Sequence, residues 1–363
     1  MTLYVKSTWT DEAAFNADSE KPQGLTFGVD AFSSIQEAVN VADSGSTVYI
    51  DGDLSGAVVA DNGKNLTFVG TANIDWSKGW FMVGRGTTDA VDTEITFKNA
   101  VIANDNFAYN VATGFNVGQN EGPGSKKANG TLNIEDSQIV TAYMADRNVV
   151  NVKGDGIADN VYGYGSEGAA NLTVLNGFYV SRDNDDTQYA EMNLTDGAYV
   201  KVEWENSMGI GYGGGRGILN ITDSKFEAAG DQVLTNPGEL TVGANGIINI
   251  DNGVLFVEND FTNNGTINVS GNSTINAKIS GGEDGVINFK DATLIDSNIS
   301  GSYTGHMNFI DGTDNVLSGG SFDFSNVDLY VGSDGSLTIK DGASINFGRI
   351  MDIYSDVFLV ESE

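Results

Sequence analysis

The sequence predicts a right-handed parallel β-helix, because three observations agree on a solenoid of short strands. The chain of 363 residues has 47 glycines and only 3 prolines, which favours many turns over long helices. An asparagine recurs between two apolar residues, as in LNI at 132–134 and INI at 248–250. The pattern also returns at a nearly constant interval, and units that cannot bury an apolar face alone can do so when stacked.

The repeat can be followed through the apolar residue that precedes each Asn or Thr. These markers are Leu66, Ile95, Leu132, Val150, Leu172, Met192, Leu219, Leu240, Ile248, Ile267, Ile287, Met307 and Leu337. From Ile248 to Met307 they advance by 19, 20 and 20 residues. About fourteen turns at the roughly 4.8 Å spacing of neighbouring strands would give a rod on the order of 70 Å long. A β-sandwich also has short strands, but it does not predict one pattern at one interval.

Within each unit, apolar and polar residues alternate, which is typical of half-buried strands. The DG, NG or DS pairs between the alternating segments predict tight corners. In GTINVSGN (265–272), Ile267 and Val269 should face the core and Asn268 should face outward. Outward asparagines at the same position of successive turns can hydrogen-bond along the axis, as in stacked parallel strands.

The start of the chain differs from the repeat. Over residues 30–56, Ile35, Ala38, Val39 and Ala42 have the spacing of an amphipathic helix. Ser34 with Glu37 fits a capping box, as does Ser33 with Gln36, and Gly45 can end the helix. We expect this helix to cover the apolar end of the solenoid. The predicted organisation is therefore residues 1–56 as an N-terminal strand and capping helix, and residues 57–363 as one continuous β-helix with long loops to about residue 217.

Two stretches resemble known proteins. AFSSIQEAVNVADSGSTVYIDG (31–52) resembles the N-terminal entry of pectin-lyase-like β-helix proteins, in which an IQEAV helix and a turn precede a VYI strand. The turns from about residue 217 onward, which are rich in Gly, Asn and Thr, resemble the passenger regions of bacterial autotransporters and related surface adhesins, as in GELTVGANGIINIDNGVLFV (238–257). These resemblances imply a secreted or surface-displayed β-helix that binds, adheres or degrades polysaccharide.

The charge excludes some partners. Fifty acidic against 18 basic residues give a net charge of −32, which repels nucleic acid and anionic lipid. The absence of cysteine excludes disulfides and thiolate metal sites. No apolar window is long enough for a membrane span, and MTLYVKSTWTDE does not have the pattern of a signal peptide. We expect a monomer located outside the cell, with any leader and anchor not in this chain.

Five loops interrupt the repeat and could form one edge if they stack: WFMVGRGTTDA (80–90), FNVGQNEGPG (115–124), VYGYGSEGAA (161–170), YVSRDNDDTQ (179–188) and GIGYGGGRG (209–217). Aromatic rings beside polar groups suit an extended glycan or a surface protein. The candidate ligand-binding residues are Trp80, Arg85, Gln119, Tyr164, Glu167, Arg182, Asp185, Tyr212 and Arg216. Alternatively, the glycines and aspartates only form corners and the arginines pair locally with carboxylates.

The resemblance also implies an enzymatic alternative. β-Helix lyases use carboxylate-bound calcium and a basic residue, and here only Arg182, Asp183, Asp185, Asp186 and Arg216 could form such a set. The NTD, DD, GHG and RIK series of related hydrolases is missing except for the DD in RDNDD. His306 is expected to be a turn residue.

Calcium could bind at DGDLSG (51–56), RDNDDT (182–187) or DGTDN (311–315), although Asp and Gly are common turn formers, and no other cofactor is predicted. The sequence therefore predicts a binding or adhesion module, with a lyase or hydrolase acting around residues 80–217 and a structural spacer as alternatives.

Overall fold

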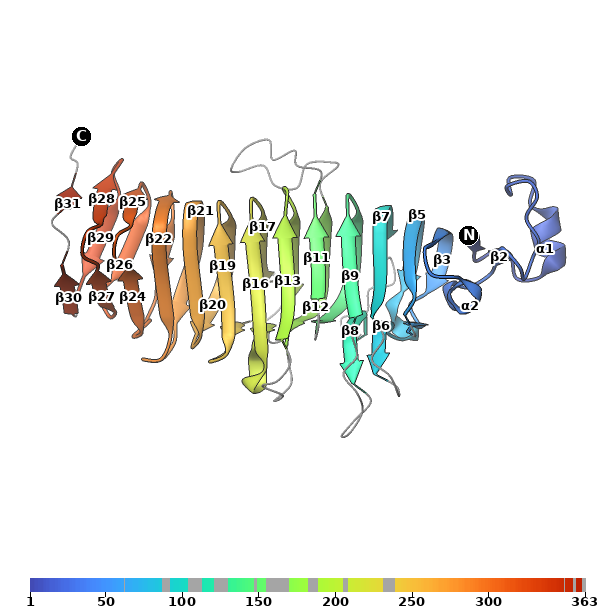
Figure 1. The fold of residues 1–363 in the computed structure, drawn as a ribbon, viewed down its shortest axis with the longest axis horizontal. Helices are drawn as coiled ribbons and strands as arrows, with labels where there is room; N and C mark the ends of the chain where they lie inside the picture. The colour runs from blue at the N-terminus through green and yellow to red at the C-terminus, as the bar shows by residue number, and fades with distance from the viewer. Residues whose placement is uncertain are drawn as a thin grey trace.

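The protein is a parallel β-helix, as the sequence predicts, and forms the long rod shown in Figure 1. The structure, a computed structural model, describes residues 1–61, 63–86, 92–103, 113–120, 130–146, 149–154, 170–181, 189–204, 208–230, 239–348, 350–354 and 357–360. Every ladder between named strands in these segments is parallel, so each turn of chain pairs with the turns before and after it.

Sheet 1 contains one strand from every turn. Its members, in order along the rod, are β1 (Thr2–Lys6), β3 (Ser46–Ser55), β5 (Asn65–Asp75), β7 (Thr93–Ala103), β9 (Gly130–Glu135), β11 (Val149–Lys153), β13 (Tyr189–Thr195), β16 (Arg216–Thr222), β19 (Gly246–Asp251), β21 (Thr266–Ser280), β22 (Val286–Ile295), β24 (His306–Phe309), β27 (Asp328–Val331) and β30 (Ile350–Ile353). The number of turns agrees with the fourteen or so expected from the repeat.

Sheet 2 follows sheet 1 around a corner. It contains the later halves of β3, β5 and β7, then β10 (Gln138–Asp146), β12 (Asn171–Val180), β14 (Tyr199–Trp204), β17 (Lys225–Gly230), β20 (Val254–Asn263), the middle of β21, β23 (Asn298–Ser300), β26 (Ser321–Phe324) and β29 (Ser344–Phe347). It runs from one end of the rod to the other.

Sheet 3 closes the cross-section in the first part of the rod. It contains β4 (Val58–Ala60), β6 (Phe81–Gly86), β8 (Phe115–Asn120), the ends of β10 and β12, β15 (Met208–Ile210), β18 (Leu240–Val242) and the ends of β20 and β21. From β22 onward another stack lies between sheets 1 and 2, made of the end of β22, β25 (Asp314–Ser318), β28 (Ser336–Lys340) and β31 (Val357–Val360). The turns therefore change shape along the rod.

The sequence markers do not all belong to one sheet. Leu172 lies in sheet 2, Leu240 in sheet 3, and Leu337 in the stack that begins at β22. The other ten lie in sheet 1, which explains their more regular spacing. Apolar and polar residues alternate along the strands of every sheet, so this alternation alone cannot assign a strand to its sheet.

The core is the column of inward-facing side chains. Ile267 and Val269 are each 1% exposed, whereas Asn268 between them is half-buried. Large rings fill the centre of the rod, as where Phe97 packs between Phe68 and Phe115 at ring-centroid distances of 5.2 and 5.6 Å. The predicted alternation is therefore confirmed.

The asparagines form a continuous hydrogen-bonded ladder on the outer side of sheet 1. Asn268 Nδ2 donates to Asn249 Oδ1 at 2.8 Å, and Asn288 Nδ2 donates to Asn268 Oδ1 at 2.9 Å. The eight members are Asn133, Asn151, Asn193, Asn220, Asn249, Asn268, Asn288 and Asn308, and each donates toward the preceding turn. This ladder fixes the register between turns, because each amide from Asn133 to Asn288 donates to the turn before it and accepts from the turn after it.

Glycine at the start of many sheet 1 strands allows close backbone contact. In GIINI (246–250), a Cβ on Gly246 would lie 2.2 Å from the Ile210 carbonyl oxygen, and in GTINV one on Gly265 would lie 2.3 Å from the Gly246 oxygen. The repeating unit is therefore Gly, any residue, apolar, Asn, apolar. The glycine is required where consecutive turns touch.

The corners after sheet 1 are tight, as the DS and NG pairs predict. Asp223 and Asn252 adopt left-handed backbone conformations, with φ of 47° and 50°. The next residue is small and buried, as Ser224 and Gly253 show. Asp and Asn tolerate this conformation better than most residues, which explains their frequency here.

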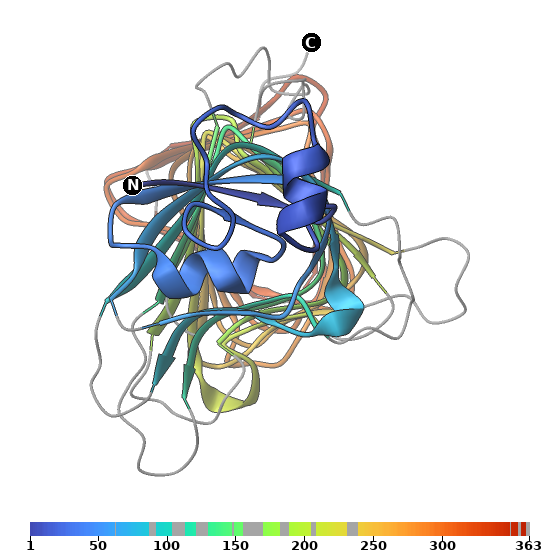
Figure 2. The same cartoon turned by 90° about the vertical axis from the view of Figure 1, so that its right-hand side faces the viewer.

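Helix α2 (Ile35–Val41) covers the first turns, as predicted. Ser34 is its N-cap and accepts a hydrogen bond from the Glu37 backbone N–H at 3.3 Å. The helix ends at Val41, earlier than the Gly45 boundary expected from the sequence. Ile35, Ala38 and Val39 are buried in the main core, so α2 seals the end of the rod in the end-on view of Figure 2.

Residues 7–30 form an additional lobe, the N-terminal lobe, which the sequence did not predict. It contains α1 (Glu12–Ala17), and β2 (Ala31–Phe32) follows it and pairs with β1. Trp9 and Phe15 pack edge to face at 5.2 Å in a small separate core. The lobe lies beyond α2 at the end of the rod (Figure 1).

Candidate functional site

Four of the five predicted loops begin where sheet 3 ends. The strands before them are β6, β8, β12 and β15, and each connects onward to a strand of sheet 1. These strands belong to neighbouring or nearby turns, so the four loops begin along one side of the rod. We call the corner between sheet 3 and sheet 1 the loop edge.

The fifth loop contains Tyr164 and Glu167, which lie outside the described residues. The strands that flank it are β11 in sheet 1 and β12 in sheet 2. This loop therefore connects a different pair of sheets from the other four, and it does not begin at the loop edge.

Strands β6 and β8 continue past the loop edge and pair there. Arg85 is in register with Gln119, and Gly86 with Asn120. Figure 1 shows the ends of both strands extending below the body of the rod. The two predicted residues thus lie on neighbouring strands, at a point where the chain projects toward solvent.

The structure describes one residue of the candidate catalytic set. Arg182, Asp183, Asp185 and Asp186 lie outside the described residues, whereas Arg216 is the first residue of β16 and is half-buried. Arg216 is in register with Tyr189 on β13. The described part of the chain therefore contains one member of the five.

Three aromatic residues gather on the outer side of sheet 3, and we call them the aromatic patch. Trp80 precedes β6 and packs against Tyr179 of β12. The Tyr179 ring lies 5.9 Å from that of Tyr212, which belongs to η2 (Tyr212–Gly214). Tyr179 is 8% exposed and Tyr212 is 40% exposed, so one ring lies largely beneath its neighbours and the other faces solvent.

The backbone around η2 holds the Tyr212 ring in this position. The backbone N–H of Tyr212 donates to the Ser181 carbonyl oxygen at 3.0 Å, and this hydrogen bond connects η2 to the preceding turn. A Cβ on Gly209 would lie 2.5 Å from the Tyr212 Cβ, so only glycine leaves room for the tyrosine here. The patch is a fixed part of the solenoid.

Trp80 and Tyr212 were candidates from the sequence, but Tyr179 was not. Tyr179 follows Phe178 in a strand, and two adjacent large aromatics usually indicate a core. Here Phe178 faces inward and is fully buried, whereas Tyr179 points to the opposite side of sheet 3. Strand alternation would have identified it once the inward position of Phe178 was known.

No metal centre is formed in the described part of the chain, where no group of three His, Asp or Glu side chains gathers. At the DGTDN corner, the Asp311 carboxylate accepts hydrogen bonds from the Tyr330 hydroxyl and the Ser333 N–H, both at 2.8 Å. The hydrogen bond to Asp311 raises the pKa of Tyr330. The Asp311 carboxylate, a predicted calcium ligand, therefore already accepts hydrogen bonds from two protein groups.

The single histidine lies at the start of β24. His306 Nδ1 is 4.0 Å from the Asp328 carboxylate, and its side chain is about half exposed. His306 is a strand residue and not the turn residue expected from the sequence. Neither α-helix among the described residues is long and apolar enough to cross a membrane.

In the comparisons with known proteins, no protein-family model, no curated protein and no solved structure matched this chain. The fold and the site define a parallel β-helix that carries a partly exposed aromatic patch beside its loop edge.

Proposed function

We propose that the protein is a secreted or cell-surface binding module, without catalysis, that recognises extended glycans through the aromatic patch. The observation that carries this proposal is the contact of Trp80, Tyr179 and Tyr212 across several turns of one sheet. The resemblance of residues 31–52 and 238–257 to pectin-lyase-like and autotransporter-passenger sequences supports the setting outside the cell.

The length of the patch suits a polymer. Trp80 precedes β6 and Tyr179 lies on β12, with β8 and β10 between them. Three strand spacings correspond to roughly 14 Å. Sugar rings stack on aromatic faces, and polar groups beside those faces bind the hydroxyls. The accessible parts of Trp80 and Tyr212, with the Tyr179 ring packed beneath them, therefore offer two separate contacts to one chain.

The negative net charge of the protein restricts the kind of polymer that it can bind. At a net charge of −32, the protein repels polyanions at low salt, so neutral glycans are the expected ligands. Arg216, the first residue of β16, lies beside the loop edge and offers guanidinium donors to the hydroxyl groups of a sugar.

The experiment is a glycan array, followed by affinity measurements on the glycans that bind. Tyr212→Ala should lower affinity about tenfold, which corresponds to about 1.4 kcal/mol for an exposed ring in contact with the ligand. Trp80→Ala should have an effect at least as large. Tyr354→Ala is the matched control, because Tyr354 is 62% exposed and lies at the far end of the rod, and it should bind as the native protein does.

Other outcomes would decide between the alternatives. Unchanged binding by the Trp80→Ala and Tyr212→Ala variants would move the site elsewhere. Absence of saturable binding to any glycan would favour the spacer. Turnover of a uronate polymer with calcium, lost on Asp185→Ala, would establish the lyase.

A further inference from the structure

A hollow lies between the N-terminal lobe and the first turns of the rod. Its volume is about 380 Å³. The residues used below are Tyr4, Lys6, Glu20, Tyr49, Asp51 and Thr71, all of which line it. We call it the N-terminal pocket. No sequence pattern pointed to it, because its walls come from the non-repeating lobe.

The floor of the pocket is a stacked pair of tyrosines. Tyr4 of β1 and Tyr49 of β3 are in register in sheet 1, and their rings lie 5.0 Å apart at an interplanar angle of 11°. Tyr49 is 43% exposed although it is a large aromatic residue in a central strand. Its ring is therefore held in place by Tyr4 while part of it remains accessible.

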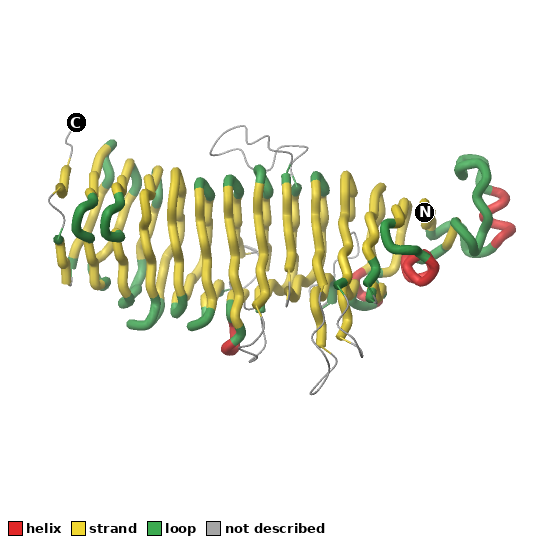
Figure 3. Tube along the Cα trace, viewed as in Figure 1, coloured by secondary structure: helices red, strands yellow, loops and turns green. Residues whose placement is uncertain are grey.

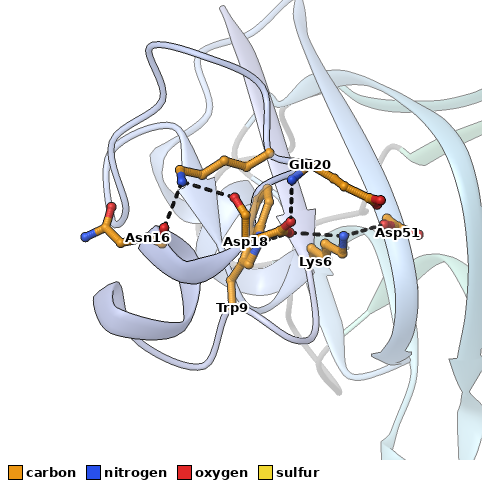
Figure 4. A network of polar contacts seen from close by, with 7 residues as sticks. Lys6, Trp9, Asn16, Asp18, Glu20 and Asp51 are labelled. Carbon is orange, nitrogen blue, oxygen red and sulfur yellow. Dashed lines mark hydrogen bonds and ion pairs between the residues drawn. The ribbon is translucent and has the colours of Figure 1, made fainter.

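The wall of the pocket is tied to this floor by one carboxylate (Figure 4). Asp18 accepts hydrogen bonds from Lys6 Nζ at 3.1 Å, Trp9 Nε1 at 2.9 Å and the Glu20 backbone N–H at 2.8 Å. Lys6 Nζ also lies 3.5 Å from the Asp51 carboxylate. The lobe is thereby connected to both β1 and β3, and the pocket is formed before any ligand arrives.

Several polar groups around the pocket remain open to a ligand. Within the described residues, no protein group donates a hydrogen bond to the Glu20 carboxylate, and the hydroxyls of Tyr4, Tyr49 and Thr71 make no side-chain hydrogen bond. They combine acceptors with groups that both donate and accept. Lys6 is already paired with Asp18 and Asp51. The other lysine of the lining, Lys21, donates from Nζ to the Asn16 and Asp18 carbonyl oxygens at 3.2 and 3.1 Å. Both ammonium groups are thus held by protein acceptors, and the carboxylates of Glu20 and Asp51 balance their charge, so the lining does not select an anion.

We propose that the N-terminal pocket binds a neutral pyranose sugar, as a single residue or the end of a short oligosaccharide. The sugar face stacks on the exposed side of Tyr49, and neighbouring hydroxyls donate to Asp51 and Glu20. The volume, an exposed aromatic face and mixed hydrogen-bonding groups without excess positive charge all match this class of ligand. The site is separate from the aromatic patch, which begins at β6 on sheet 3.

The experiment is a titration of the full chain with methyl glycosides of glucose, galactose, mannose and N-acetylglucosamine, followed by calorimetry and saturation-transfer NMR. We expect at least one to bind with a Kd on the order of 1 mM. Tyr49→Ala should weaken that binding at least tenfold, whereas Tyr49→Phe, which keeps the ring, should stay within about threefold. Asp51→Asn should weaken it several-fold.

Matched controls separate this proposal from the one above. Tyr212→Ala should leave binding of the methyl glycosides unchanged, and Tyr49→Ala should leave polymer binding at the aromatic patch unchanged. Tyr49 is partly exposed, and the thermal unfolding of each variant shows whether the fold is retained.

Three results would overturn the proposal. One is the absence of binding by every neutral glycoside at concentrations well above 1 mM. Another is equal binding by the native protein and a folded Tyr49→Ala variant. The third is preference for methyl glucuronide or tetramethylammonium over the neutral probes, which would assign the pocket to a charged ligand.

Discussion

The two halves of the rod keep one register but differ in what they place between the strands. In the regular half, residues 239–348, consecutive ladder asparagines from Asn249 to Asn308 are 19, 20 and 20 residues apart. In the loop half, before residue 231, the separation falls to 18 between Asn133 and Asn151 and rises to 42 between Asn151 and Asn193. The asparagine hydrogen bonds continue from Asn133 to Asn308 through both halves, and the strands that carry them stack side by side along the rod (Figure 3).

The comparison shows that the number of residues in a turn can vary while the register between neighbouring strands stays the same. Extra residues enter between strands, where the backbone reaches the surface, and the inward column continues beneath them. This is the behaviour expected of a solenoid whose stability comes from contacts between neighbouring turns. The loop half can therefore change its surface for binding at little cost to the fold.

The largest effect should come from removing a ring from the central column. Phe97→Ala in the loop half and Phe289→Ala in the regular half should each lower the free energy of unfolding by about 3–5 kcal/mol. Both rings are fully buried, but Phe97 contacts three other phenylalanine rings and Phe289 stacks on Phe309 at 4.8 Å. Denaturant unfolding measures the loss, with Phe97→Ala expected to be larger. A loss below about 1 kcal/mol in both would contradict a shared packed core.

The next effect should come from interrupting the asparagine ladder. Asn151→Ala and Asn268→Ala each remove one donated and one accepted side-chain hydrogen bond. The neighbouring half-buried amides lose a partner, so each variant should lose about 1–3 kcal/mol. The losses should be similar despite the different turn lengths. Asn326→Ala is the control, because Asn326 is exposed and bonds only to the adjacent Ser325. A loss of stability in only one of the two variants would show that the ladder does not stabilise both halves of the rod.

The sequence predicted the features that repeat or are local. The alternation around Asn268, the corners at Asp223 and Asn252, and the capping of α2 by Ser34 depend on neighbouring residues, and all three agree with the structure. The glycine at the start of the repeating unit was also present in the sequence. Its role depends on contact with another turn and is therefore visible only in the fold.

Features that depend on distant pairing were not predicted. The N-terminal lobe has no repeat, and its core forms only because Trp9, Phe15 and Ala31 meet. The Tyr4–Tyr49 pair joins residues far apart in the chain, and only the strand register brings them together. The same holds for Tyr179, whose neighbour Tyr212 belongs to the next turn of sheet 3.

A more local effect should follow acidification, because the N-terminal lobe is tied to the solenoid by charge whereas the solenoid is held by packing. Hydrogen bonds from Trp9, the Glu20 N–H and Lys6 lower the pKa of Asp18 to about 2. The folded pKa lies below the ordinary value of 3.8. The contribution of Asp18 is therefore complete above that value and is lost as the pH falls through about 2.

We expect the indole signal of Trp9 to change between pH 4 and pH 2, measured by NMR. Asp18→Asn cannot pair with the Lys6 charge, so its lobe should already be loosened at pH 7 and should show no further change in this range. Far-UV circular dichroism reports on the solenoid as the control. An identical acid transition in the native protein and in Asp18→Asn would assign the effect to another carboxyl.

The smallest effect should come from converting a long turn into a short one. Residues 154–170 connect β11 to β12, whereas in the next turn only Asp196, Gly197 and Ala198 connect β13 to β14. Replacing 154–169 with Asp-Gly before Ala170 reproduces that short corner. The shorter closure should favour folding by roughly 1–1.5 kcal/mol, so the unfolding midpoint should stay the same or rise slightly. A variant with residues 155–169 in scrambled order controls for loop length.

The same replacement tests which loops serve the site. It removes Tyr164 and Glu167 from a loop that joins sheet 1 to sheet 2, whereas the loop edge lies between sheet 3 and sheet 1. Glycan binding at the aromatic patch should therefore remain within about threefold of the native value, less than 1 kcal/mol. A tenfold loss of binding in a variant with an unchanged unfolding midpoint would show that the fifth loop folds over toward the patch. The binding surface would then span two corners of the solenoid instead of one.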